Sequence, residues 1–221
     1  MTFQTKKAAL AIVQGLSEPS KLSCYGYSLP AAECKTGAEM AKTTGTICAL
    51  CYAKRGNYLW AHTQAALYRR LKSLSDPNWV DAMVYLIKDM PYFRWHDSGD
   101  IQDMQHLLKI VSVAKLTPST MHWLPTREYV IVNDYIMAAR EVARKAKKAF
   151  RKYIPENLVI RLSATRFEGK APEALARKLG VLVSGVSKKE YNCPAHEQDN
   201  KCKTCTMCWD KNVFNIVYRR H

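Results

Sequence analysis

Four cysteines near the C-terminal end are spaced so that their sulfurs could meet around one metal centre. Cys193 is followed, after eight intervening residues, by Cys202, Cys205 and Cys208 at intervals of three. Three thiolates from a short loop, with a fourth supplied from nearby, form a usual ligand set for an iron–sulfur cluster. Zinc also accepts four thiolates, but its sites more often pair two separate Cys-x2-Cys knuckles. The spacing therefore favours a [4Fe–4S] cluster over zinc.

A second group of cysteines precedes the first long predicted helix. Cys48 and Cys51 form a Cys-x2-Cys pair, and Cys34 lies upstream of them. Such a pair is typical of a metal knuckle or a thioredoxin-type redox pair, but no strand is predicted directly before it, as the redox interpretation would require. With Cys34 as third ligand, a second cluster would keep one iron for a small ligand. A single cluster with ligands from both groups is the alternative, and Cys24 is better explained as a small apolar residue.

Composition indicates the class and compartment of the protein. Its 221 residues are 48% hydrophobic and 24% charged, which is ordinary for a soluble globular protein. No apolar run has the length of a membrane helix, and the apolar run 8–13 is too short for the core of a signal peptide. We therefore expect a cytoplasmic protein with no membrane contact, whose cysteines bind metal instead of forming disulfides.

A formal charge of +15 favours phosphate-bearing or otherwise acidic partners. The densest basic stretch lies on an amphipathic helix predicted over 134–152. Its basic residues are Arg140, Arg144, Lys145, Lys147, Lys148, Arg151 and Lys152. Two interpretations stay open for them: a solvated helix face or a nucleic-acid contact.

The segments between the two cysteine groups alternate between strand-like and helical patterns. Strands are predicted over 92–96, 121–124, 158–162 and 181–183, and helices over 57–73, 76–87, 104–114, 134–152 and 172–179. This alternation indicates βα units and a mainly parallel sheet. Upstream, the region 17–46 is expected to have little regular structure apart from a short strand near 22–27.

Small polar residues follow each of the four predicted strands. The segments are DSGD (97–100), PTRE (125–128), SATR (163–166) and SGVS (184–187). Because the carboxyl ends of parallel strands gather on one rim, where ligands bind, we predict a small-molecule or cofactor site there. Its candidate residues are Ser98, Gly99, Asp100, Thr126, Arg127, Ser163 and Ser184.

Several residues near these strand ends have structural as well as functional interpretations. His96 could ligate a metal or transfer a proton, or it could be a buried residue bonded to a neighbour. Asp100 could hold a cationic group of a ligand, whereas Asp97 or Asp100 could instead cap the next helix. Arg127 and Arg161 could bind a carboxylate or phosphate, or form ion pairs with Glu128 and Asp97.

Three segments resemble the phage protein family known as gene product 88. They are CKTGAEMAKTTGTICALCYAKRGNY (34–58), FRWHDSGDI (93–101) and CPAHEQDNKCKTCTMCW (193–209). The resemblance covers most of the chain. It implies a phage-encoded protein in the host cytoplasm, and it implies no defined biochemical role.

The layout is also similar to that of radical S-adenosylmethionine enzymes, which use a partial βα barrel. Cys48-x2-Cys51-Tyr52 is similar to the end of their C-x3-C-x2-C motif, and Ser98-Gly99-Asp100 to their glycine turn. The tail cysteines resemble the auxiliary cluster region of some members. The chain departs from the pattern because the motif's first cysteine would fall at Thr44, and because an aspartate replaces the family's glutamate. The resemblance implies S-adenosylmethionine as a cofactor.

Together these observations predict an α/β fold with a partial (βα) barrel over 1–187 and a cysteine-rich tail over 188–221 that folds back over the ligand rim. We expect one [4Fe–4S] cluster, or two, and redox or radical chemistry at the rim. The alternative is a cluster-bearing or zinc-stapled protein that binds nucleic acid or regulates without catalysis.

Overall fold

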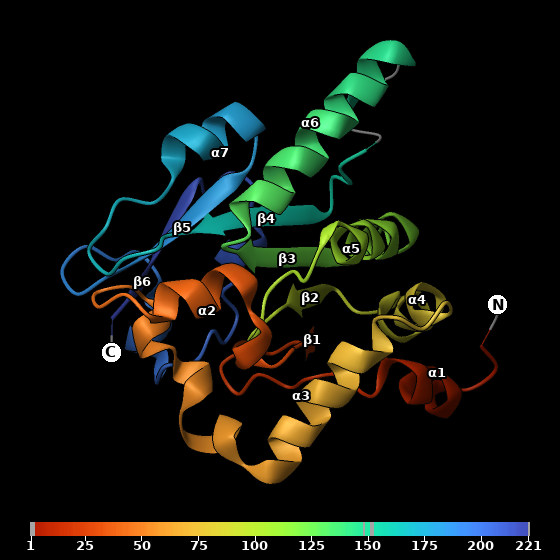
Figure 1. Cartoon of the computed structure of the whole chain (residues 1–221), viewed down its shortest axis with the longest axis horizontal. Helices are drawn as coiled ribbons and strands as arrows, with labels where there is room; N and C mark the ends of the chain where they lie inside the picture. The colour runs from red at the N-terminus through yellow and green to blue at the C-terminus, as the bar shows by residue number, and fades with distance from the viewer. Residues whose placement is uncertain (1–2, 148, 151–152, 221) are drawn as a thin grey trace.

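The centre of the molecule is an open sheet of six parallel strands. The computed structural model describes residues 3–147, 149–150 and 153–220. The strands are β1 (Gly26–Tyr27), β2 (Tyr92–Trp95), β3 (Met121–Thr126), β4 (Leu158–Ser163), β5 (Leu182–Ser187) and β6 (Asn215–Arg219). They lie in the order β1-β2-β3-β4-β5-β6, so that each strand pairs with the next one along the chain (Figure 1). The predicted α/β fold with a parallel sheet and an unclosed barrel is confirmed.

Seven α-helices are present in the described part of the chain. They are α1 (Lys6–Val13), α2 (Lys35–Ala41), α3 (Ala61–Ser73), α4 (Trp79–Ile87), α5 (Met104–Leu116), α6 (Tyr129–Lys145) and α7 (Glu173–Leu179). Short 3-10 helices span Ala31–Glu33, Cys48–Leu50, Tyr52–Lys54, Gly56–Leu59, Pro194–Gln198 and Met207–Trp209. None of the helices among the described residues has both the length and the apolar character needed to cross a membrane.

The two faces of the sheet are covered by different parts of the chain. Successive residues of a strand point to opposite faces, so Phe93 packs in the large core with the helices, whereas Tyr92 packs in a smaller cluster with the C-terminal tail. In that smaller cluster the Trp123 and Trp209 rings meet edge to face, with centroids 5.4 Å apart. The Trp209 indole N–H also donates to the Phe93 carbonyl at 3.0 Å. The tail is therefore packed directly on the sheet.

The strand β6 was not predicted from the sequence. It follows the last cysteine and pairs with β5 over five residues, from Val183 opposite Asn215 to Ser187 opposite Arg219. The tail thus supplies an edge strand to the sheet. The predicted boundary at 187/188 stays a prediction.

Two helical predictions were wrong in their extent. The region 17–46 contains α2, and the helix expected over 57–73 begins at Ala61 after a 3-10 turn. The helix expected over 134–152 runs from Tyr129 to Lys145, and Lys147 follows it with a left-handed φ of 48°. The predicted basic helical face is therefore shorter, and Lys148, Arg151 and Lys152 lie outside the described residues.

Buried histidines lie between the sheet and the helices. His122 is fully buried and stacks on Trp95 with ring centroids 6.0 Å apart. The Thr117 hydroxyl donates to the Val113 carbonyl, so the 2.8 Å contact between Thr117 Oγ1 and His122 Nε2 makes Nε2 the donor. Burial lowers the pKa of His122 to about 3 and that of His106 to about 4, both from 6.5. Both imidazoles are therefore neutral near pH 7.

We expect His122 to make stability depend on pH. As the pH falls below 6.5, His122 becomes protonated in the unfolded chain, whereas in the folded protein it stays neutral down to about pH 3. The contribution of neutral His122 to the free energy of unfolding is therefore complete above pH 6.5 and is lost as the pH falls. Between about pH 7.5 and about pH 5 this one group should cost about 2 kcal/mol of unfolding free energy. Urea unfolding at both pH values should show that His122→Phe loses about 2 kcal/mol less than the parent chain, and an equal loss would contradict the assignment.

Candidate functional site

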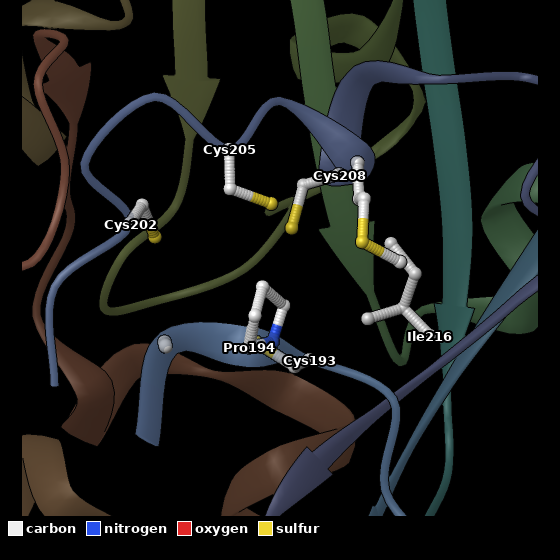
Figure 2. Close-up of a pocket in the computed structure, with 8 residues that line it drawn as sticks. Cys193, Pro194, Cys202, Cys205, Cys208 and Ile216 are labelled. Atoms are coloured by element: carbon white, nitrogen blue, oxygen red, sulfur yellow. The ribbon is translucent and has the colours of Figure 1, made fainter. Parts of the chain in front are cut away.

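The four cysteines of the tail line one pocket. Figure 2 shows Cys202, Cys205 and Cys208 along one loop, with Cys193 on the segment that faces it. The remaining lining residues are Pro194, Ala195, Met207 and Ile216. All four cysteines are free thiols. The structure thus brings together the group that the sequence spacing singled out.

Backbone hydrogen bonds fix the positions of these cysteines. The Cys202 N–H donates to the Lys21 carbonyl at 2.8 Å, and the Cys205 N–H closes a turn onto the Cys202 carbonyl at 2.8 Å. Cys208 belongs to the 3-10 helix Met207–Trp209. The Cys193 N–H donates to the Val217 carbonyl of β6 at 3.2 Å. Two separate segments, 193–195 and 202–208, therefore supply the four cysteines.

Arg161 of β4 fastens the cysteine loop to the sheet. Its guanidinium is fully buried and donates to backbone carbonyls only. The acceptors are the carbonyls of Cys208 (3.0 Å), Val183 (3.3 Å), Val213 (2.8 Å), Phe214 (3.4 Å), Met207 (3.2 Å) and Asp210 (2.7 Å). The prediction that Arg161 binds a carboxylate or phosphate, or forms an ion pair, was wrong. A single arginine in a buried strand gives no sequence signal for a role of this kind.

Burial keeps the thiols of Cys193, Cys202 and Cys208 protonated near neutral pH in the folded protein. Burial raises the pKa of Cys208 to about 12, although the Tyr218 hydroxyl at 3.5 Å and the charge of Arg94 act in the opposite direction. Burial also raises the pKa of Cys193 and of Cys202. A metal centre would convert such thiols to thiolates and release their protons.

Arg94 of β2 is a second, half-buried cation that sequence reasoning missed. It forms an ion pair with Asp97 at 2.6 Å, and its guanidinium lies 4.5 Å from the centre of the Trp123 ring. The positive charge of Arg94 lowers the pKa of Cys202 and Cys208, although burial has the larger, opposite effect on both. Arg94 therefore lies between the tail pocket and the turn that follows β2.

Cys24 also lies beside the tail group. It packs against the small hydrophobic cluster that contains Cys208 and Cys193. Burial raises its pKa to about 11, with a smaller contribution in the same direction from Cys202. No partner for Cys24 was predicted from the sequence, because Cys193 and Cys202 belong to a segment more than 160 residues away.

The second cysteine group lies at the rim of the sheet. Cys34 immediately precedes α2, and Cys48 lies in the turn after it. Both sulfurs lie close to Gly37 of α2, because a Cβ atom placed on Gly37 would be 3.7 Å from the sulfur of Cys34 and 3.5 Å from that of Cys48. Burial raises the pKa of Cys34 to about 12, and the negative charges of Asp100, Cys51 and Cys48 act in the same direction. The structure thus brings all three predicted cysteines to the same neighbourhood as Asp100.

Asp100 is the centre of a hydrogen-bond network at this rim. Its Oδ1 accepts from the Thr126 hydroxyl at 2.6 Å and the Ile101 N–H at 2.8 Å, and its Oδ2 accepts from the Arg127 N–H at 2.9 Å. Burial nevertheless raises its pKa to about 6. The prediction that Asp97 or Asp100 caps the next helix was wrong, because the side chain of Asp103 caps α5.

The other rim candidates have partners within the protein. The Arg127 guanidinium donates to the Ala164 carbonyl at 3.0 Å, and the Ser184 hydroxyl lies 3.2 Å from that of Ser163. The Ser98 hydroxyl donates to the Leu29 carbonyl at 2.8 Å, and Gly99 lies directly against the same residue. Asp100, Thr126 and Arg127 thus form one group, whereas Ser98 and Gly99 serve packing between the ends of β1 and β2.

His96 lies immediately after β2 and contacts His106 of α5. It is buried with a left-handed φ of 55°, and its ring centroid is 5.2 Å from that of His106. Neither of its ring nitrogens has a hydrogen-bond partner within the part of the chain that the structure describes. Burial lowers its pKa well below 6.5, so the ring is neutral.

Neither cysteine group has the geometry of a site for one metal ion. Across the described ranges, no group of three or more His, Cys, Asp or Glu side chains is arranged so that it could hold a single ion. The sulfurs around one zinc ion would be about 3.8 Å apart, given Zn–S bonds of about 2.3 Å and tetrahedral geometry. The thiols of the tail line one pocket without forming this arrangement.

Comparisons with known proteins identify the family of the chain but find no curated relative. No curated protein matches the chain, and no solved structure matches it. The family model described as Gene product 88 matches residues 2–211, a range that includes both cysteine groups and the first five strands. The chain therefore belongs to the Gene product 88 family.

Proposed function

We propose that the tail pocket binds a [4Fe–4S] cluster through Cys193, Cys202, Cys205 and Cys208. The observation that carries the proposal is the pocket itself, which is lined by four free thiols from two tethered segments, 193–195 and 202–208. Thiolates are the preferred ligands of such clusters, and the ligands of a cluster stand farther apart than those of a single ion. The absence of a single-ion arrangement among the described residues is compatible with this larger group.

The rim cysteines are proposed to hold a second cluster. Cys34, Cys48 and Cys51 supply three thiols, which leaves one iron without a cysteine ligand. That iron would lie near Asp100. Because the pKa of Asp100 is raised to about 6, its carboxyl group could exchange a proton with a ligand of the iron. We propose redox chemistry on a small molecule at this rim. S-adenosylmethionine is the candidate that the sequence resemblance suggests.

The chain's own residues have defined roles in this proposal. Arg161 holds the tail loop against β4, and Arg94 supplies a positive charge between the two cysteine groups. A bound cluster would supply a one-electron couple. Because both cysteine groups are buried or half-buried, the protein shields them from solvent and favours retention of the metal.

We expect protein purified without oxygen to be brown and to contain about four irons and four sulfides for each cluster. Cys202→Ser/Cys205→Ser should remove the tail cluster and about four irons, and Cys34→Ser/Cys48→Ser should remove the rim cluster alone. Iron, sulfide and zinc assays, with visible and electron paramagnetic resonance spectra, measure this directly.

Cys24→Ser provides the matched control, because it makes the same substitution beside the tail pocket outside the proposed ligand set. It should keep the iron content of the parent protein. Colourless protein with stoichiometric zinc would refute the proposal. A shift of the spectrum on adding S-adenosylmethionine, abolished only in the rim variant, would identify the rim ligand.

A further inference from the structure

Large apolar side chains are exposed along one segment beside the rim. Residues 50–62, called here the aromatic–basic segment, connect the second cysteine group to α3. Four of its side chains are exposed although they are apolar or aromatic: Leu50 (46%), Tyr52 (56%), Leu59 (63%) and Trp60 (53%). Figure 1 shows the stretch between α2 and α3 at the margin of the molecule, away from the helices that cover the sheet. Side chains of this size in one short stretch indicate a binding surface.

The charged residues of this segment and of its flanks in the sequence are all basic. From residue 42 to residue 72 the sequence has six lysines and arginines and no aspartate or glutamate. Lys54 and Arg55 are exposed, and within the described ranges neither takes part in an ion pair. In contrast, Arg144 and Lys145 on α6 both pair with Glu141, at 2.8 and 3.3 Å. The aromatic–basic segment is therefore better suited to an anionic partner than the basic helix α6, for which the sequence left a nucleic-acid contact open.

Two tyrosines attach this segment to the rim. The hydroxyls of Tyr52 and Tyr58 both donate to Asp97, the first to its carbonyl and the second to its carboxylate. The Lys54 N–H donates to the Cys51 carbonyl at 3.1 Å. A ligand bound to Lys54 would therefore lie near the second cysteine group.

We propose that the aromatic–basic segment binds single-stranded nucleic acid. Exposed aromatic rings beside lysine and arginine are the arrangement by which proteins stack unpaired bases and hold the phosphates between them. Trp60 and Tyr52 would stack bases, and Lys54 and Arg55 would contact phosphates. A duplex offers no free base faces for such stacking, so single strands are the preferred ligand. None of these four side chains is a proposed cluster ligand, so the proposal does not rest on the presence of a cluster.

The test is fluorescence anisotropy with labelled oligo-dT and oligo-U of about 15 nucleotides, using the full chain purified without oxygen. Trp60→Ala should weaken binding at least about fivefold through the loss of stacking. Lys54→Ala/Arg55→Ala should weaken it and reduce the slope of log affinity against log salt by about 1.4, since two phosphate contacts are lost.

Matched control variants remove side chains of the same kinds, two cations and one exposed apolar group, from α6. Arg144→Ala/Lys145→Ala deletes two cations from α6, and Val130→Ala trims a side chain that is 72% exposed. Both should bind like the parent protein. Iron assays on every variant show whether the cysteine groups are intact, so a failure of the cluster proposal is seen separately.

Three results would overturn the inference. The first is no binding of either oligonucleotide at about 50 mM salt, where phosphate contacts are strong. The second is loss of binding in the α6 variant with full binding in Lys54→Ala/Arg55→Ala. The third is a parent protein that is oligomeric by light scattering and becomes monomeric in Trp60→Ala, which would make the segment an interface between copies of the chain.

Discussion

Arg161→Met is expected to lower the free energy of unfolding by about 3–5 kcal/mol, a large part of the stability of a domain this size. The guanidinium is fully buried and satisfies six backbone carbonyls, four of which belong to the tail segment 207–213. Methionine fills a similar volume but donates no hydrogen bond, so these carbonyls would be left without the donor that they now have. Urea unfolding of the two proteins measures the difference.

Arg69→Met is the control for this substitution. Arg69 is exposed on α3, so the same change there should alter stability by less than about 0.5 kcal/mol. If Arg161→Met were as stable as Arg69→Met, the guanidinium would not be what holds the tail. Because the acceptors include the carbonyl of Cys208, Arg161→Met should also reduce the iron retained by the tail group, and Arg69→Met should not.

The contrast between Arg161 and the cysteines explains what could be predicted from the sequence. The spacing of Cys202, Cys205 and Cys208 is local, so a short loop is enough to bring them together, and the pocket follows from it. The parallel sheet was predictable for the same reason, since each βα unit shows its own pattern. The acceptors of Arg161 lie 22 to 53 residues away along the chain, and no periodic pattern connects a donor with distant backbone carbonyls.

The predicted bounds of helices and strands were wrong where tertiary contacts or backbone conformation determine them. The strand β6 has only five residues, and its pairing with β5 defines it, so the sequence pattern of 215–219 alone was not distinctive. α6 ends at Lys145 although basic residues continue the amphipathic pattern, because Lys147 adopts a left-handed conformation. The interpretation of 134–152 as a single basic helix depended on a periodicity that the backbone does not follow.

The turn after β2 shows how one motif can have two explanations. In the sequence, Ser98-Gly99-Asp100 is similar to a cofactor-binding glycine turn. In the structure, Gly99 has a φ of 79° and lies so close to Leu29 that an added Cβ would be 2.6 Å from the Leu29 Cβ and 2.9 Å from its carbonyl oxygen. The need for glycine therefore follows from the contact between the ends of β1 and β2.

Gly99→Ala is accordingly expected to be strongly destabilising, and Gly15→Ala is its matched control. Both glycines have left-handed backbones, with φ of 79° and 88°, but a Cβ on Gly15 would meet nothing within 4 Å. Gly15→Ala should therefore cost only the conformational strain, about 1–2 kcal/mol. Gly99→Ala should cost this strain and the overlap with Leu29 as well, for a total above about 3 kcal/mol. Urea unfolding of both variants gives the comparison, and equal losses would show that the contact with Leu29 is not tight.

The overlap at Gly99 has few ways to relax. The Leu29 N–H donates to the Ser98 carbonyl at 2.9 Å, and the Ser98 hydroxyl donates back to the Leu29 carbonyl at 2.8 Å. Moving the two loops apart to admit a methyl group would break both hydrogen bonds and would displace Asp100, the next residue. If the rim cysteines hold the proposed second cluster, Gly99→Ala should therefore release its iron, while the proposed tail cluster should keep its own. Loss of iron from both groups together would instead indicate that one cluster draws its ligands from both.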